Sequence, residues 1–108
     1  MRTLLAILVL AAAGAAHARG NAESGKALVT SKACVTCHGA DGAKPSTPDQ
    51  PILAGQHYDY LVRALVDYKT GARANPIMKG FAAQLSTQDI EDLAAWFASQ
   101  KSPLHDQR

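Results

Sequence analysis

The segment ACVTCHG contains both cysteines of this 108-residue chain, Cys34 and Cys37, and a histidine, His38, directly after them. Two cysteines at this spacing serve three chemistries: a dithiol that makes and breaks a disulfide, a metal site of thiolates and imidazole, and covalent attachment of a haem. In the third, both sulfurs are bonded to the haem and the histidine ligates its iron. The remainder of the sequence has to discriminate among these interpretations.

The spacing of the three residues suits haem attachment. Positions i, i+3 and i+4 of a helical turn share one face, so Cys34, Cys37 and His38 present two sulfurs and an imidazole to the same side. The thiols can then bond to the two vinyl groups of the porphyrin while the imidazole faces the iron. Because C-x-x-C-H is the attachment pattern of c-type haem, we expect haem c bound covalently through Cys34 and Cys37, with His38 as a metal ligand.

The dithiol and zinc interpretations remain as minor alternatives. A thioredoxin-like dithiol requires a βαβ context, and no segment of the chain has the pattern of a sustained strand. A structural zinc site requires four ligands. Beyond the motif and the N-terminal segment, only His57 and His105 remain, and they do not form a ligand pair of recognisable spacing.

The first 18 residues have the layout of a secretory signal peptide. Arg2 precedes an apolar run over residues 4–13, and small residues end in the A-x-A pattern Ala16-His17-Ala18. The run is shorter than the ~20 residues that span a bilayer, so a retained anchor is the lesser alternative. We expect a signal peptide over 1–18, a mature domain over 19–108, a periplasmic location and no stable membrane insertion after cleavage.

The expected mature chain is nearly neutral. Without Arg2 it carries ten basic and nine acidic side chains. Nucleic acids and anionic membranes favour strongly basic surfaces. We therefore expect neither of them as the main partner.

Three segments have the apolar periodicity of amphipathic helices. Asn21 and Ser86 are expected to cap two of them, and Gly71 is expected to end the middle one. We predict helices over residues 22–33, 56–70 and 87–100.

Two long segments rich in glycine and proline separate these helices, over residues 39–55 and 71–85. Irregular segments of this length are uncommon in compact domains unless they have a function. A domain this small can bury only a limited core of its own. Loops that wrap a large apolar cofactor would resolve both difficulties, and this argument does not depend on the cysteines.

Three stretches together resemble the class I cytochromes c: GKALVTSKACVTCHGADG, PILAGQHYDYLVRALVDYKTGARANPIMKG and LSTQDIEDLAAWFAS. The resemblance covers nearly all of the expected mature chain and is strongest to the small bacterial periplasmic branch that includes the two domains of cytochrome c4. This chain has one C-x-x-C-H and so resembles a single half of cytochrome c4. The resemblance implies an all-α cytochrome c fold, with three main helices and long loops wrapping one covalent haem.

The resemblance also implies the second axial ligand of the iron. The family places its axial methionine in the loop before the last helix, where this chain has Met78 in NPIMKG, the only methionine besides Met1. His38 and Met78 are thus the expected metal ligands, and a methionine that only fills a core gap is the alternative for Met78. Pro51 matches the family's proline whose carbonyl accepts the Nδ1 proton of the proximal histidine.

These expectations together predict a soluble periplasmic one-electron carrier of a respiratory chain, and not an enzyme. Its partners would be redox proteins, with a terminal oxidase or a periplasmic dehydrogenase as candidates by resemblance. The alternative function is a haem-based catalytic or gas-sensing domain. That function would require an open position on the iron, where Met78 is expected to bind.

Overall fold

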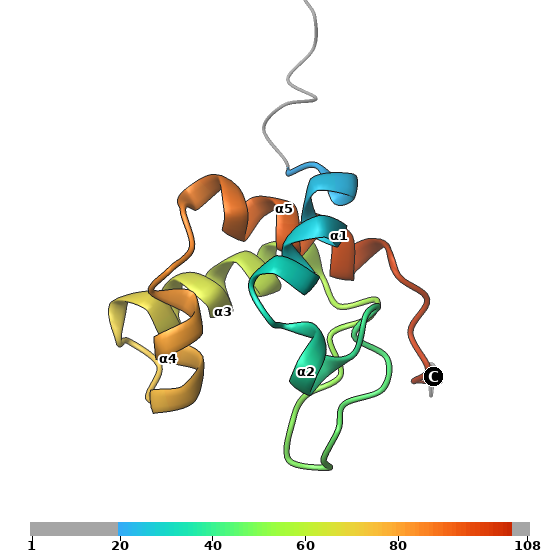
Figure 1. Ribbon diagram of the computed structural model, residues 1–108, viewed down its shortest axis with the longest axis horizontal. Helices are drawn as coiled ribbons and strands as arrows, with labels where there is room; N and C mark the ends of the chain where they lie inside the picture. Colours follow the sequence, from blue (N-terminus) through green and yellow to red (C-terminus); the bar gives the residue numbers. More distant parts are fainter. Residues whose placement is uncertain (1–19, 105–108) are drawn as a thin grey trace, which may run out of the picture.

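The computed structural model describes residues 20–104, and this part of the chain is all-helical with no strand (Figure 1). The all-α prediction is therefore confirmed. The predicted signal peptide, residues 1–18, and His105 lie outside the described residues. None of the helices within 20–104 is long and apolar enough to cross a membrane. In chain order the helices are α1 (Ala22–Ser31), α2 (Val35–His38), α3 (Tyr58–Thr70), α4 (Pro76–Ala82) and α5 (Thr87–Ser99).

Helices α1 and α5 cross in close contact at the point where Gly25 lies (Figure 1). A Cβ atom on Gly25 would lie 2.0 Å from the backbone oxygen of Asp92 and 2.9 Å from the Cβ atom of Trp96. The Oδ1 atom of Asp92 also accepts a hydrogen bond from the backbone N–H of Asn21 at 2.8 Å. The start of α1 is thus attached directly to the middle of α5.

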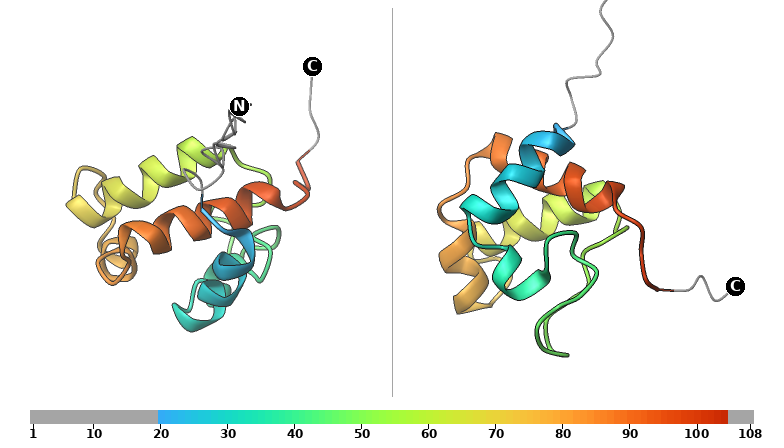
Figure 2. Two further views of the ribbon diagram at one scale, coloured as in Figure 1. Left: turned by 90° about the horizontal axis from the view of Figure 1, so that it is seen from above. Right: turned by 45° about the vertical axis from the view of Figure 1, so that its right-hand side comes forward.

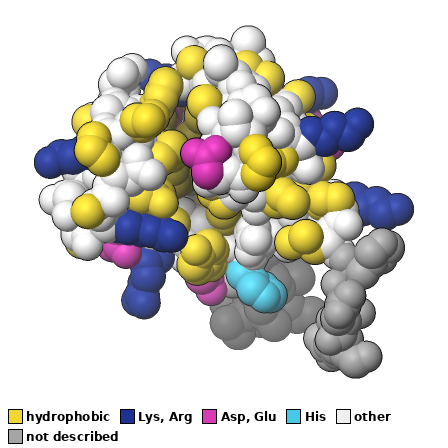
Figure 3. All heavy atoms as spheres, turned by 90° about the horizontal axis from the view of Figure 1, so that it is seen from below, with side chains coloured by type: hydrophobic (Ala, Val, Ile, Leu, Met, Phe, Trp, Pro, Cys, Tyr) yellow, Lys and Arg dark blue, Asp and Glu magenta, His cyan; other side chains and the backbone are white. Residues whose placement is uncertain are grey.

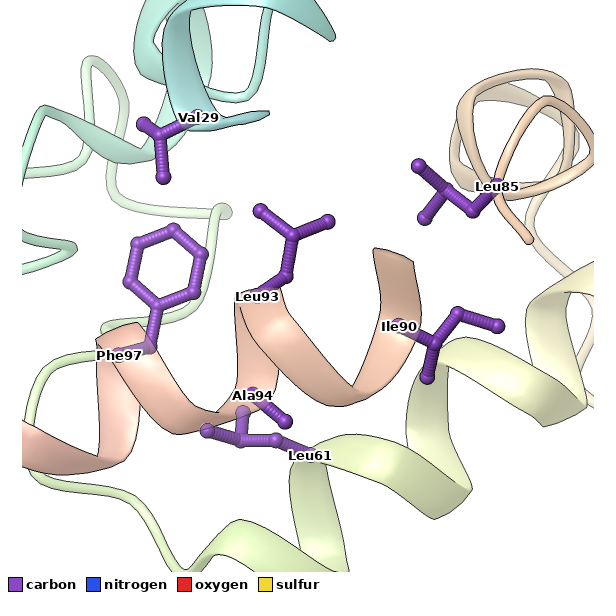
Figure 4. Packing of buried hydrophobic residues seen from close by; sticks show 7 residues of the cluster. All are labelled: Val29, Leu61, Leu85, Ile90, Leu93, Ala94 and Phe97. Carbon is purple, nitrogen blue, oxygen red and sulfur yellow. The ribbon is translucent and has the colours of Figure 1, made fainter. Parts of the chain in front are cut away.

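The hydrophobic core is built around one face of α5 (Figure 4). Seen from above, α3 runs alongside α5, and α1 crosses on another side (Figure 2). Spacings of three and four residues place the apolar side chains of α5 on one stripe, as the sequence predicts. The buried cluster consists of Ile90, Leu93, Ala94 and Phe97 of α5 with Val29, Leu61 and Leu85.

Three of the predicted helix ends, at Asn21, Gly71 and Ser86, are confirmed, whereas α3 begins two residues after the predicted residue 56 and α5 ends one residue before the predicted residue 100. The side chain of Asn21 accepts the N–H of Ser24 at 3.0 Å. Ser86 and Asp89 form a reciprocal capping box, with both side chain to backbone distances at 3.0 Å. Gly71 ends α3 with a φ of 84°, a conformation that glycine adopts without steric cost.

Two expectations about secondary structure were wrong. The segment 71–85 is not all loop, because Pro76 and the Asn75 cap begin the seven-residue helix α4 within it. Periodicity could not reveal this helix, since only Ala82 of its residues is buried. The first helix ends at Ser31, before the predicted residue 33, because Ala33 has a φ of 61° and turns the chain toward α2.

Candidate functional site

The residues predicted as ligands, Cys34, Cys37, His38 and Met78, all line one cavity. Its empty volume is about 1090 Å³, including the part that is open to solvent. Helices α2 and α4, which lie apart from one another in Figure 1, both contribute lining residues, and so do α3 and α5. Most of the other lining residues are apolar: Ala33, Pro51, Leu53, Leu61, Ala64, Leu65, Ile77, Phe81, Leu93, Ala94 and Phe97, beside Tyr68, Asp49, Gln50 and Asn75.

The two cysteines and the histidine share one helical turn, as their spacing predicts. The turn at Ala33 is followed by Cys34, which caps α2, and the backbone N–H of His38 donates to the carbonyl of Cys34 at 3.0 Å. Both cysteines are free thiols. Burial raises the pKa of the Cys34 thiol, and Cys37 nearby acts in the same direction against a backbone hydrogen bond that lowers it.

The imidazole of His38 is only 6% exposed and is held by one backbone contact. Its Nδ1 atom lies 3.1 Å from the carbonyl oxygen of Pro51, as the resemblance predicts. A carbonyl oxygen can only accept, so Nδ1 carries the proton and Nε2 of the neutral ring keeps a lone pair for a metal. Burial lowers the pKa of His38 against the Pro51 contact, which raises it, and the lowered pKa favours this metal-binding form.

Met78 reaches the cavity from the first turn of α4. Its backbone N–H and that of Ile77 both donate to Oδ1 of Asn75, each at 3.1 Å. The two neighbouring side chains differ in environment, since Met78 is partly buried while Ile77 is 70% exposed. His57, the other histidine among the described residues, precedes α3 at its N-cap position, is exposed and does not line the cavity.

The sequence analysis assigned no site role to Tyr68, Asn75 or Phe81, which also line the cavity. Tyr68 belongs to the apolar stripe of α3 and carried no further signal. The pair Asn75-Pro76 is a recognisable helix start, a capping residue followed by proline at the first helical position. That signal could have located α4, but it could not have shown that Asn75 borders the cavity.

The face on the side of α2 and α4 is mixed in character. Figure 3 shows it from below: hydrophobic side chains are spread over it, an acidic side chain lies near its middle, and most lysine and arginine side chains lie toward the edges. A surface of this kind suits transient contact with another protein.

The donor set fits a flat apolar cofactor that carries one metal ion. The two thiols can form covalent bonds to the cofactor. The imidazole nitrogen of α2 and the thioether sulfur of α4 can bind its metal ion, and apolar side chains surround all of these groups. Thioether and imidazole are the axial pair of haem iron in cytochromes c. Among residues 20–104 no cluster of three or more His, Cys, Asp or Glu could hold a metal ion by itself.

Comparisons with known proteins agree with this geometry. Residues 22–101 match the family model described as cytochrome c. The chain is 46% identical over 95 residues to cytochrome c4 of Pseudomonas aeruginosa, covering 88% of this chain and 46% of that protein. It is 37% identical over 98 residues to a protein of Stutzerimonas stutzeri named thiosulfate dehydrogenase electron acceptor, covering 91% of this chain and 45% of the relative.

A solved structure gives the same result for the fold. The crystal structure of reduced recombinant cytochrome c4 from Pseudomonas stutzeri superposes with a TM-score of 0.71 at 39% identity, covering 79% of this chain and 48% of that one. The chain therefore spans about half the length of the relatives that it matches.

Proposed function

This chain belongs to the cytochrome c family, and from that premise we propose that it is a periplasmic one-electron carrier with His38 and Met78 as the axial ligands of its iron. The family binds haem c covalently, and we assign the thioether bonds of this chain to Cys34 and Cys37. The chain makes or breaks no bond in a substrate in this role. The bound haem supplies an iron that takes up and releases one electron.

The observation that carries the proposal is the convergence of these side chains on one cavity. Cys34, Cys37 and His38 come from one turn, whereas Met78 comes from a separate helix far along the chain. With His38 and Met78 both bound, the iron would have no open position, which would favour electron transfer over catalysis or gas binding. Two fixed axial ligands also keep the geometry constant between the oxidised and reduced states.

The walls of the cavity support a carrier with a raised reduction potential. Leu61, Leu93 and Phe97 are buried core residues that also line the cavity. An apolar, water-poor surrounding disfavours the more highly charged ferric state, and a thioether ligand acts in the same direction. The Pro51 carbonyl acts oppositely through His38, because it makes the imidazole a stronger donor.

The proposed location and partners follow from the sequence pattern and from the relatives. The signal-like residues 1–18 support export to the periplasm, where haem c would be attached. One relative is named as the electron acceptor of a thiosulfate dehydrogenase, so we propose a periplasmic dehydrogenase as one class of donor. A respiratory complex or a terminal oxidase is the proposed acceptor class.

The test is maturation of the full chain in a periplasm that attaches haem c. Intact mass spectrometry should give the chain starting at Arg19 plus one haem, and a Cys34→Ala, Cys37→Ala double variant should carry no covalent haem. The ferric protein should show the near-infrared band of sulfur-to-iron coordination, and the ferrous protein should not bind carbon monoxide readily. A bare chain with two reactive thiols would contradict haem attachment. A missing band with ready carbon monoxide binding would instead support a catalytic or gas-sensing domain.

A further inference from the structure

Helix α4, which carries Met78, is held by little besides its own ends. It has seven residues, of which only Ala82 is buried, and α3 is its main packing partner. A helix of this length is unstable in isolation. Gly80 in its interior lowers its helical propensity further, and no neighbouring atom lies within 4 Å of the position where a Cβ would be. The hydrogen bonds at the start of α4 therefore have more influence on its position than those of a well-packed helix.

Asn75 makes those hydrogen bonds, and one of them goes to the ligand residue itself. Its Oδ1 atom accepts the backbone N–H of Ile77 and that of Met78, each at 3.1 Å. Asn75 is extended, with φ −156° and ψ 104°, as the following Pro76 requires. Pro76 would favour this backbone conformation in a variant, so replacing the side chain of Asn75 removes the two hydrogen bonds and a polar group at the border of the cavity.

We propose that Asn75 is a positioning residue for the axial ligand: its side chain holds the backbone of Met78 so that the thioether stays on the iron. The inference rests on the proposed ligation by Met78 and adds the group that maintains it. Without the cap, the first turn of α4 frays more often, and each fraying event withdraws Met78. The ferric iron is then open to an external ligand for a larger fraction of the time.

The chain offers a matched control for this inference. Asn21 caps α1 in the same manner, with its Oδ1 atom accepting the N–H of Ser24 at 3.0 Å. No residue of α1 lines the cavity. Asn21→Ala therefore removes an equivalent cap and lowers overall stability without acting on Met78.

The experiment titrates the ferric holoprotein with imidazole, which competes with the thioether for the iron. Asn75→Ala should raise the apparent affinity for imidazole about fivefold, the equilibrium equivalent of losing one N-cap, and should weaken the near-infrared sulfur-to-iron band. Asn75→Ser restores a capping oxygen and should return both readouts close to those of the unmodified chain. Asn21→Ala should leave both unchanged, although guanidinium denaturation should show a comparable loss of stability. If the alanine variant does not accumulate, Asn75→Gly also removes the acceptor with a smaller effect on the helix.

The outcomes separate this inference from the proposed function. A band in the unmodified chain, together with equal imidazole affinity in Asn75→Ala and Asn21→Ala, would overturn the role of Asn75 and leave ligation by Met78 intact. If the unmodified chain shows no band, the ligation by Met78 is wrong, and the role of Asn75 is wrong with it. A fivefold rise in imidazole affinity that occurs in Asn75→Ala but not in Asn21→Ala, and that Asn75→Ser reverses, supports both the ligation by Met78 and the role of Asn75.

Discussion

The Nδ1 atom of His38 lies 3.1 Å from the backbone carbonyl oxygen of Pro51, thirteen positions further along the chain. The contact joins the end of α2 to the loop that follows it. It fixes the orientation of the ring and the position of its proton, and it makes the other nitrogen a stronger donor. Pro51 is the residue whose carbonyl accepts this proton, and its ring restricts φ there. The proline thus helps to keep the accepting carbonyl in place.

Substitution of Pro51 is expected to raise the reduction potential of the bound haem. Pro51→Ala keeps the carbonyl but frees the backbone, so the hydrogen bond to His38 weakens and the ferric state loses stabilisation. The expected rise is up to about 60 mV, one tenfold step for a single electron, measured by redox titration. Pro48→Ala changes a proline of the same loop that does not line the cavity. An equal shift in both variants would attribute the effect to the loop as a whole.

Substitution of Met78 is expected to lower the potential while the haem stays attached. Met78→Ala removes the thioether that favours ferrous iron and leaves the proposed bonds at Cys34 and Cys37. The fall should be on the order of 100 mV, well inside the ~0.8 V range over which axial ligands set haem potentials. Ile77→Ala, at the adjacent position that is 70% exposed, removes part of the cavity wall but no donor atom, so it should shift the potential much less. An unchanged potential in Met78→Ala would mean that another residue is the sixth ligand.

A methyl group at the crossing of α1 and α5 is expected to be strongly destabilising. In Gly25→Ala the new Cβ would lie 2.0 Å from the backbone oxygen of Asp92, so the two helices must separate. The expected loss is about 3 kcal/mol or more, at the upper end of the overpacking range. Guanidinium denaturation of the holoprotein, followed by the fluorescence of Trp96, the only tryptophan, would measure it.

The same substitution at the other helix-interior glycine should have the opposite sign. A Cβ on Gly80 meets nothing within 4 Å, so Gly80→Ala in α4 should stabilise by about 0.4–1 kcal/mol through the unfolded chain. A large loss of stability here would show that a neighbour lies against Gly80 in the holoprotein. Similar losses in both variants would contradict a special role for the crossing at Gly25.

The carboxylate of Asp92 is expected to contribute to stability through its hydrogen bonds. Asp92 is buried, and its Oδ1 atom accepts from the N–H of Asn21 and from Nε2 of Gln88, each at 2.8 Å. Asp92→Ala leaves these donors without their partner and should cost about 1–3 kcal/mol in thermal or chemical denaturation. Asp92→Asn keeps an acceptor oxygen and should cost less. Equal losses would mean that charge and not hydrogen bonding is the stabilising property.

The sequence alone predicted the part of the site that lies within one helical turn. It did not predict the part that comes from a segment far along the chain. Cys34, Cys37 and His38 lie within one helical turn, so their spacing alone predicts that they share a face. Met78 lies far along the chain, and only the family resemblance connected it with them. The structure brings Met78 to the same cavity by means of α4, a helix without a periodic apolar face, which hydrophobic periodicity therefore does not reveal.

The end of α1 shows a second limit of local reasoning. Alanine favours helix, so the sequence predicted continuation through Ala33. The structure instead gives Ala33 a φ of 61°, a conformation that costs any residue with a Cβ. The turn there directs the chain from α1, which packs on α5, into α2 beside the cavity. No glycine or proline near Ala33 indicates this turn in the sequence.

The contact between α1 and α5 also affects the order of events when the domain folds. The hydrogen bond from Asn21 to Asp92 spans 71 residues, so the part of the core between α1 and α5 forms only when the two ends of the domain have come together. Contacts of such long range slow the search for the folded state. We therefore expect an enzyme that modifies Cys34 and Cys37 in the periplasm to reach their thiols more readily before these two helices meet than afterwards.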